Sequence, residues 1–307
     1  MDTVGITGGT GLVGRQIVTM LRARGHRVVI FTRRLPAHPP SDAMVQYALW
    51  DYVSGTCDTN ALASISAMIH LAGEPVAARR WTPARKALIL NSRVRGTSFL
   101  ADMLAHHAPH CHTVISASAI GYYGPDVSVS TAFTEEAAPY SDFLASTCLQ
   151  WETAAASVAE FARLVTIRIG IVLAKEGGAL PRLAATLPLH VLPVPGNGRQ
   201  IVSWIHVQDL ARMFIHALDD KKVSGVYNGV APHPVSFSEL VRAVSHTRSG
   251  PFWRPHVPAG LIRLAMGEMS IEVLKSCTVS SAAIVNTGFS FRFPSVAGAV
   301  KELLSVD

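Results

Sequence analysis

Three glycines near the start of the chain have the spacing of a turn that holds phosphates. Gly8, Gly11 and Gly14 stand three residues apart in TGGTGLVG, after an apolar run and before an amphipathic stretch. In such a turn the first glycine allows the tight bend, the second lets the backbone approach a pyrophosphate, and the third allows close helix–strand packing. The N–H groups and dipole of the helix start favour negative charge. The spacing predicts a dinucleotide site rather than a glycine-rich turn without a ligand.

Two arginines end the second apolar run. In dinucleotide-binding folds this position normally carries an acidic residue for the adenosine 2′-hydroxyl, but here the run ends Phe31-Thr32-Arg33-Arg34. A carboxylate would repel a 2′-phosphate, whereas guanidinium groups pair with it through two hydrogen bonds. The sequence therefore predicts NADP(H) rather than NAD(H). The alternative is that both arginines merely solvate the end of a strand.

Short apolar runs alternate with longer amphipathic stretches through most of the chain. VGIT, VVIFT, AMIHLAG, TVISAS and LVTIRIG indicate strands buried on both faces, and helices are expected over residues 12–24, 83–105 and 143–162. This alternation predicts an α/β fold with a Rossmann-like doubly wound parallel sheet. We expect residues 1–231 to form the nucleotide-binding domain, with 171–200 contributing to a substrate lobe. Residues 232–307 would form a smaller, mainly helical lobe that closes the substrate cleft.

The composition argues against several classes of protein. The net charge of +6 is spread over 307 residues without a dense Lys/Arg tract, which suits an anionic small ligand better than nucleic acid. No apolar run approaches the roughly 20 residues of a membrane span. The cysteines and histidines lack the spacing of a metal site. We expect no metal, nucleic-acid or membrane partner and, since the first strand leaves no room for a signal peptide, a cytoplasmic protein.

The motifs TGGTGLVG, HLAG, SASAIGYYG and SWIHVQDL occur in an order that resembles extended short-chain dehydrogenases/reductases of the epimerase/dehydratase type. HLAGEPVAARRW, NSRVRGT, RIGIVLAKEGGAL and GFSFRFP are similar to one branch, which carries a C-terminal domain of unknown function and is often described as nucleoside-diphosphate-sugar epimerases. The resemblance covers essentially the whole chain. It implies an NADP(H)-dependent oxidoreductase or epimerase-like enzyme, and a possible homodimer. With the excess of positive charge, we expect its substrate to be small and anionic.

Matched position by position, the resemblance implies a set of residues around the cofactor. The phosphates would contact Gly8, Thr10, Gly11, Leu12, Val13 and Gly14, and the 2′-phosphate would contact Arg33 and Arg34. The adenosine side would include Asp51, Leu71, Ala72, Gly73 and Glu74. A phosphate would be reached by Arg93, and the nicotinamide would lie beside Ser116 and Val172.

The catalytic pair typical of the resembled family is missing. Its members use a serine or threonine followed by Tyr-x-x-x-Lys, in which the tyrosine transfers a proton and the lysine lowers the tyrosine pKa. Ser118 fits the serine role, but the start of the next helix has Phe143 and Thr147 at the tyrosine and lysine positions. Tyr122 or Tyr123 could supply the proton, or could instead pack on the cofactor. Water or the substrate could also supply it, or the protein could bind NADPH without turnover, as a sensor.

The substrate side departs from the pattern as well. Nucleotide-sugar epimerases often carry an arginine just ahead of the strand SWIHV, where this chain has Val202. Arg199 is a possible replacement. Arg79 and Arg80 beside Trp81 would suit an anionic, partly planar substrate, although these side chains could equally face water.

Overall fold

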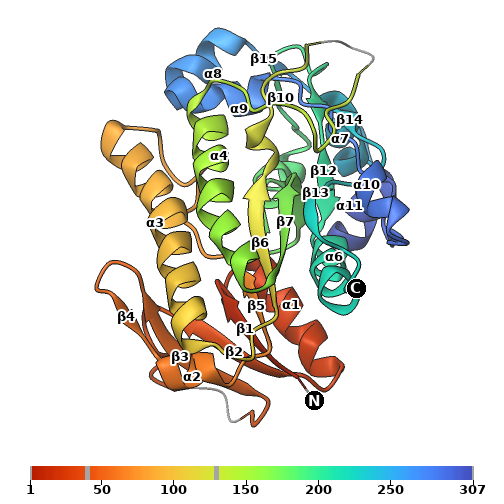
Figure 1. Cartoon of the computed structure of the whole chain (residues 1–307). Helices are drawn as coiled ribbons and strands as arrows, with labels where there is room; N and C mark the ends of the chain where they lie inside the picture. Colours follow the sequence, from red (N-terminus) through yellow and green to blue (C-terminus); the bar gives the residue numbers. More distant parts are fainter. Residues whose placement is uncertain (1, 39–41, 128–130, 306–307) are drawn as a thin grey trace.

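The computed structural model describes residues 2–38, 42–127 and 131–305, and a large, mostly parallel sheet forms its centre (Figure 1). The strand order is β13 (Gly225–Gly229), β7 (Arg163–Ile169), β6 (Thr113–Ala119), β5 (Ala67–His70), β1 (Thr3–Thr7), β2 (Arg27–Thr32), β3 (Val45–Asp51) and β4 (Thr56–Cys57). Neighbouring strands are parallel except β3 and β4. The predicted Rossmann-like sheet is confirmed, and its strand order reverses between β1 and β5.

Helices cover both faces of the sheet. One face carries α1 (Leu12–Ala23) and α6 (Val207–Asp219), and the other carries α2 (Thr59–Ala63), α3 (Pro83–His107) and α4 (Phe143–Ala156), followed by the 3₁₀ turn η2 (Ser157–Glu160). Consecutive side chains of a strand point to opposite faces. Strand β6 therefore contributes Ile115 to the core under α1 and α6, and Val114 to the core under α2 and α3.

Local sequence signals set the ends of the helices that flank the site. Helix α3 begins after Thr82, whose hydroxyl accepts a hydrogen bond from Arg85 N, and has Pro83 in its first turn. Helix α4 begins after Asp142, whose carboxylate accepts one from Ala145 N. These capping residues satisfy N–H groups that the helix itself leaves unpaired. Between β6 and α4 the chain forms a short 3₁₀ turn, η1 (Ile120–Tyr122).

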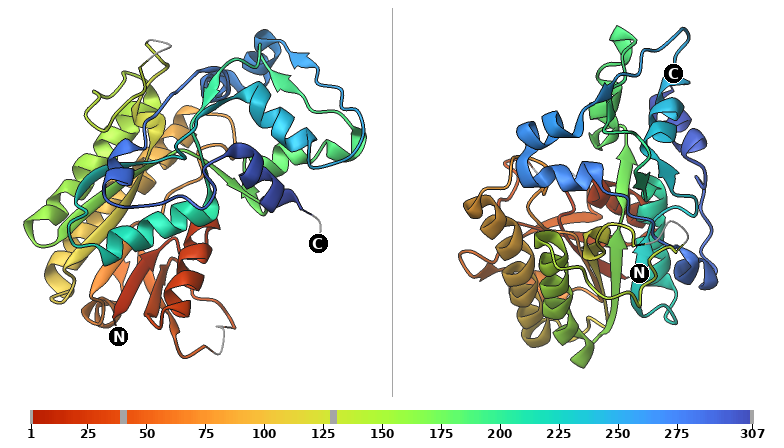
Figure 2. Two further views of the ribbon diagram at one scale, coloured as in Figure 1. Left: turned by 90° about the vertical axis from the view of Figure 1, so that its right-hand side faces the viewer. Right: turned by 90° about the horizontal axis from the view of Figure 1, so that it is seen from above.

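A smaller lobe lies over the carboxyl ends of the parallel strands (Figure 2). Its middle-chain part contains β8 (Ile171–Ala174), β9 (Gly177–Gly178), α5 (Leu180–Ala184), η3 (Leu187–Leu189), β10 (Val194–Pro195), β11 (Ile201–Val202) and β12 (Trp204–His206). Its C-terminal part contains β14 (Val235–Ser236), α7 (Phe237–Ser245), β15 (His256–Val257), α8 (Ala259–Met266), η4 (Gly267–Ser270), α9 (Ile271–Leu274) and α11 (Val296–Leu304). Helix α10 (Ala282–Asn286) instead packs on β13 and adds Ile284 to the core of the large sheet. The predicted helical C-terminal lobe is confirmed, with short added strands.

One apolar core joins the two parts of the lobe. It combines Leu173 and Trp204 with Val241 and Val300, which are far apart in sequence. Burial of these side chains removes apolar surface from water and holds the lobe together. Ala231, the last residue of the expected nucleotide-binding domain, belongs to this core of the smaller lobe. The domain boundary expected after Ala231 stays a prediction.

Within the described residues, no helix is long and apolar enough to cross a bilayer. The same residues contain no group of three His, Cys, Asp or Glu side chains that could hold a metal ion. In this part of the chain the cysteines are free thiols, and Cys111, Cys148 and Cys277 are buried.

Candidate functional site

The glycine turn connects β1 to α1 at the point where the strand order reverses. Gly8 has a φ of +72°, and a Cβ there would lie 2.9 Å from the backbone carbon of Leu71. The turn therefore packs directly on the loop that follows β5. Gly11 precedes α1 without a side chain to cap it, and the first helical turn contains no acidic residue. Among the described residues, no side chain competes for the first N–H groups of α1, which suits an anion.

The predicted phosphate-binding residues come together at this turn. Gly8, Thr10 and Gly11 form the turn, while Leu12, Val13 and Gly14 begin α1. Leu71, Ala72 and Gly73 follow β5, which pairs with β1 through Ile6 and Ile69. The carboxyl ends of β1 and β5 thus present both predicted segments at one crevice, where doubly wound sheets bind their ligands.

Buried hydrogen bonds hold the two segments in place. His70 Nδ1 lies 2.6 Å from Thr7 Oγ1, and its Nε2 lies 3.0 Å from Thr97 Oγ1. The Thr7 hydroxyl also accepts a hydrogen bond from Leu71 N at 3.3 Å. His70 is a positioning residue that the sequence analysis missed. The sequence did contain a signal for this role, because His70 is a polar residue at the end of an otherwise apolar strand.

Acidification is expected to destabilise the fold through His70. Burial lowers the pKa of His70 from 6.5 to about 4, so the folded protein resists a proton that the unfolded chain accepts. This stability is complete above pH 6.5 and is lost as the pH falls towards 4, with a loss of about 2 kcal/mol between pH 7.5 and 5. Urea unfolding of wild type and His70→Gln at both pH values tests this. An equal pH dependence in the variant would assign the effect to other groups.

The region where the adenosine is predicted to bind is strongly charged. The Arg33 side chain is 61% exposed and lies 3.8 Å from Glu74, whose other carboxylate oxygen accepts a hydrogen bond from Arg85 at 3.0 Å. Arg34 is exposed as well. The Asp51 carboxylate instead accepts hydrogen bonds from Val53 N and Ser54 within its own turn. Both guanidinium groups are thus exposed to solvent, and that of Arg33 shares the Glu74 carboxylate with Arg85.

Arg93 lies inside the protein behind the loop that follows β5. One guanidinium nitrogen donates to the carbonyl oxygens of Glu74 at 3.0 Å and Ile89 at 3.2 Å, and the group lies 5.1 Å from the Trp151 ring. Burial lowers the pKa of Arg93. Among the described ion pairs none involves Arg93, so its charge is available to an anionic ligand beside Gly73.

The residues predicted to be catalytic belong to a buried polar network. Ser118 donates to Glu152 at 2.6 Å, and Glu152 forms two hydrogen bonds with Arg168 at 2.9 and 2.8 Å. Arg168 donates to the Tyr123 hydroxyl at 2.8 Å, and Tyr123 donates to Asn228 at 2.7 Å. The network ties β6, α4, β7 and β13 together.

The network directs the Ser118 and Tyr123 side chains into the protein, and the Tyr122 ring is buried as well. Ser118 is 2% exposed and Tyr123 is completely buried. Burial raises the pKa of Tyr123 to about 12, although Arg168 opposes the shift. The Arg168 guanidinium lies 3.5 Å from the centre of the Tyr122 ring. A role of these residues in proton transfer stays a prediction that this geometry does not favour.

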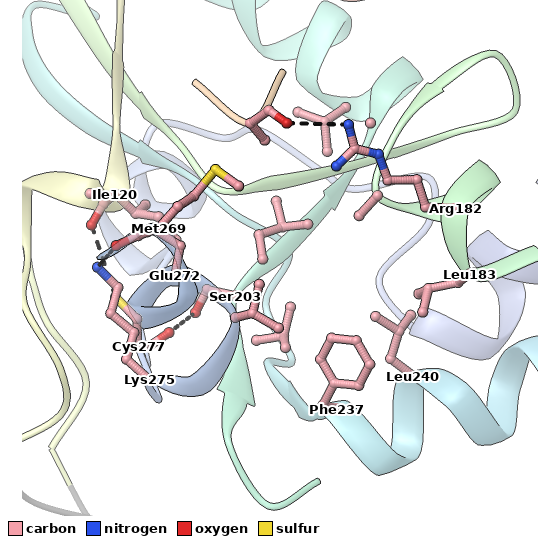
Figure 3. Close-up of a pocket in the computed structure, with 18 of the residues that line it drawn as sticks. Ile120, Arg182, Leu183, Ser203, Phe237, Leu240, Met269, Glu272, Lys275 and Cys277 are labelled. Carbon is pink, nitrogen blue, oxygen red and sulfur yellow. Dashed lines mark hydrogen bonds and ion pairs between the residues drawn. The ribbon is translucent and has the colours of Figure 1, made fainter. Parts of the chain in front are cut away.

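A cavity of about 720 Å³ separates the sheet from the smaller lobe (Figure 3). Its walls are mainly apolar and include Ile120, Gly121, Ile171, Val172, Leu183, Ile201, Val202, Phe237, Leu240, Met266, Met269 and Val273. Val172, predicted beside the nicotinamide, lines this cavity. Ser116 does not, because it is buried in β6 and its hydroxyl contacts the Ala117 carbonyl. The described lining contains three charged residues, Arg182, Glu272 and Lys275.

The arginines that were predicted to bind the substrate do not line this cavity. Arg79 and Arg199 are exposed and do not line the cavity, and Arg80 packs against Gly267. Trp81 donates its indole N–H to the Val76 carbonyl at 3.1 Å, and its ring meets Phe143 edge to face at 5.2 Å. Aromatic packing thus occupies the position where the resembled family carries its tyrosine.

Two family models match the chain. Residues 4–228 match the NAD dependent epimerase/dehydratase family, and residues 257–303 match a domain of unknown function, DUF1731. The Arabidopsis thaliana protein "Epimerase family protein SDR39U1 homolog, chloroplastic" is 33% identical over 98% of this chain and 86% of its own. "Epimerase family protein YfhF" of Bacillus subtilis is 31% identical over 98% of both chains.

A solved structure is similar over nearly the full length. The crystal structure of human epimerase family protein SDR39U1 (isoform 2) with NADPH superposes with a TM-score of 0.86, at 28% sequence identity, and covers 98% of each chain. Structures of sugar-nucleotide epimerases also superpose, among them UDP-glucuronic acid 4-epimerase from Bacillus cereus with a TM-score of 0.80 and 18% identity. At that level of identity the second likeness concerns the fold alone.

Proposed function

The chain belongs to the NAD dependent epimerase/dehydratase family, and from this premise we propose that it is an NADP(H)-dependent oxidoreductase or epimerase-like enzyme acting on a small molecule. The observation that carries the proposal is the cavity, which Val172 and Gly121 border on the side of the sheet's carboxyl edge. A cofactor bound at the carboxyl edge of the sheet, with its nicotinamide at this cavity, would supply a hydride as NADPH or take one up as NADP⁺. A cytoplasmic location and a homodimer stay predictions.

The residues at the crevice fit this cofactor. The uncapped start of α1 suits a pyrophosphate, because glycine leaves its N–H groups accessible. Arg33 and Arg34 suit a 2′-phosphate, and Arg93 provides a further positive charge beside Gly73. The human relative crystallised with NADPH supports the same choice of cofactor.

Arg33→Glu is expected to reverse the cofactor preference. The change removes a charge-assisted hydrogen bond and places a carboxylate beside the phosphate, so NADPH affinity should fall about 100-fold while NADH affinity stays similar or rises. Fluorescence titration with both nucleotides measures this. Arg27→Glu, an exposed change at the opposite end of β2, is the matched control. An unchanged preference would mean that Arg33 only solvates the end of the strand.

The missing Tyr/Lys pair favours a second candidate, a protein that binds NADPH without turnover and signals to a partner. Phe143 and Thr147 carry neither an acidic proton nor a positive charge. A sensor, however, has no need of a cavity at the reactive end of the nucleotide. Consumption of NADPH with a panel of aldehydes and ketones separates the two functions. Tight NADPH binding without turnover of any compound would favour the sensor.

A further inference from the structure

The cavity wall contains a buried ion pair that the sequence analysis did not identify. Glu272 Oε1 lies 2.5 Å from Lys275 Nζ, and the side chains are 27% and 6% exposed. Both belong to the segment that includes α9 and line the cavity. Figure 3 shows them near Ile120, on the side of the cavity opposite Arg182.

This pair has few other partners. Glu272 Oε1 and Lys275 Nζ are fully buried, and among the described residues neither atom has a hydrogen bond of good geometry, so their ion pair is the contact that joins them. Buried ion pairs that serve stability normally have their remaining hydrogen-bonding capacity satisfied. Oε1 is buried while 27% of the Glu272 side chain stays exposed at the cavity lining, so Oε2 is the carboxylate oxygen that a ligand in the cavity could reach.

Resting on the proposed function, we propose that Glu272 is the catalytic acid–base group of this enzyme and that the substrate is an apolar carbonyl compound or the corresponding alcohol. Lys275 is a positioning residue that holds the carboxylate against the cavity wall. Together they take the place of the Tyr/Lys pair, from the smaller lobe instead of α4.

The proton balance of the reaction requires such a group. A carbonyl substrate that gains a hydride at carbon must gain a proton at oxygen. Glu272 gives up the proton on Oε2, the O–H bond forms on the substrate oxygen, and the carboxylate is left beside the Lys275 ammonium. After the alcohol leaves, Glu272 takes up one proton from the bulk solvent, so each reduction consumes one proton overall. In the oxidation direction the carboxylate accepts the alcohol proton.

The walls of the cavity determine the substrate class. Aliphatic and aromatic side chains dominate them, and Val202 stands where nucleotide-sugar epimerases often carry an arginine. The one arginine of the described lining, Arg182, donates to the Ala77 carbonyl at 3.3 Å. A sugar nucleotide would lose the hydration of its diphosphate here and would meet only two cations of the described lining, Arg182 and a Lys275 that is already paired with Glu272. An apolar carbonyl compound has no such cost.

The groups around Glu272 have opposite effects on its protonation. Burial raises the pKa of Glu272, the Lys275 ammonium lowers it, and Asp142 at the start of α4 raises it. The neighbouring thiols of Cys148 and Cys277 stay neutral, because burial raises their pKa values to about 12. Arg182 lies on the opposite side of the same cavity.

Kinetics with defined probes test the proposal. NADPH consumption is followed with benzaldehyde, cyclohexanone, 2-decanone and menadione. UDP-glucose with NADP⁺ serves as the sugar-nucleotide probe, and both NADPH formation and conversion to UDP-galactose are measured, because an epimerase leaves no net change in its cofactor. We expect wild type to reduce at least one apolar carbonyl compound and to leave UDP-glucose unchanged. Glu272→Gln should lower kcat about 100-fold or more without changing NADPH affinity. Glu268→Gln, an exposed change in the same segment, is the matched control.

The pH profile distinguishes a catalytic role from a structural one. Carbonyl reduction needs protonated Glu272 and should fall as the pH rises through its pKa. Lys275→Met should move this fall to higher pH, and Asp142→Asn, which keeps a helix-capping side chain, should move it to lower pH. Carbon-13 NMR of glutamate-labelled protein, with the Glu272 signal assigned from its absence in Glu272→Gln, should show the same two shifts without any substrate.

The possible outcomes separate this inference from the proposed function. Turnover of an apolar carbonyl compound that Glu272→Gln leaves unaffected would overturn the inference alone, as would pH profiles unmoved in both Lys275→Met and Asp142→Asn. Turnover of UDP-glucose but of no apolar compound would overturn the substrate class. Tight NADPH binding with no turnover of any probe would overturn the proposed function, and this inference with it.

Discussion

Arg168→Met is expected to lower the free energy of unfolding by about 3–5 kcal/mol, because it leaves the carboxylate of Glu152 unpaired inside the protein. The side chains of Arg168 and Glu152 are 4% and 14% exposed, and two hydrogen bonds join them. The change also removes the donor to the Tyr123 hydroxyl and to the carbonyl of Glu135. Urea unfolding at neutral pH measures the loss.

Two further variants separate the buried charge from lost packing. Arg168→Met combined with Glu152→Leu removes both charges and should recover most of the lost stability. Arg24→Met breaks an ion pair with Asp219 whose side chains are about half exposed, and should cost less than about 1 kcal/mol. A loss below 1 kcal/mol in Arg168→Met would show that water reaches Glu152 and that the network contributes little to stability.

The parts of the site that local spacing determines were predictable from sequence. Gly8, Gly11 and Gly14 need only a strand before them and a helix after them, and both are visible as apolar periodicity. The position of Arg33 at the crevice likewise follows from where β2 ends. Such features depend on neighbours within a few residues, so the sequence alone contains the information that places them.

The partners of Ser118 and Tyr123 could not be predicted in this way. Ser118 contacts Glu152 on α4, and Tyr123 contacts Arg168 on β7 and Asn228 on β13. Three separate elements must pack before these hydroxyls have partners, and no spacing rule encodes that. One signal was available, since an arginine inside the apolar run LVTIRIG requires a buried partner.

The acid–base pair of the cavity escaped prediction for a related reason. Glu272 and Lys275 are three residues apart, a spacing typical of exposed helical ion pairs. Their burial results from the packing of the C-terminal segment over the carboxyl ends of the strands (Figure 2). The sequence shows the two charged residues, but only the tertiary structure shows that they line a cavity instead of the protein surface.

Gly14→Ala is expected to lower NADPH affinity by about 100-fold or more. An added Cβ would lie 2.3 Å from the Gly8 carbonyl oxygen and 2.7 Å from the Gly9 Cα, and neither backbone atom can move without moving the turn itself. Helix α1 must therefore shift away from β1, which displaces the N–H groups that face the phosphates. The shift should also cost about 1–3 kcal/mol of stability, as overpacking of a close contact does.

Gly260→Ala is the matched control for this substitution. Gly260 lies in α8, where an added Cβ meets no atom of the described chain within 4 Å, so NADPH affinity should be unchanged and stability should rise slightly. Fluorescence titration and thermal unfolding of both variants measure the two effects separately. A folded Gly14→Ala protein with wild-type NADPH affinity would contradict the expectation, because the nucleotide would then not depend on the close approach of α1 to the turn.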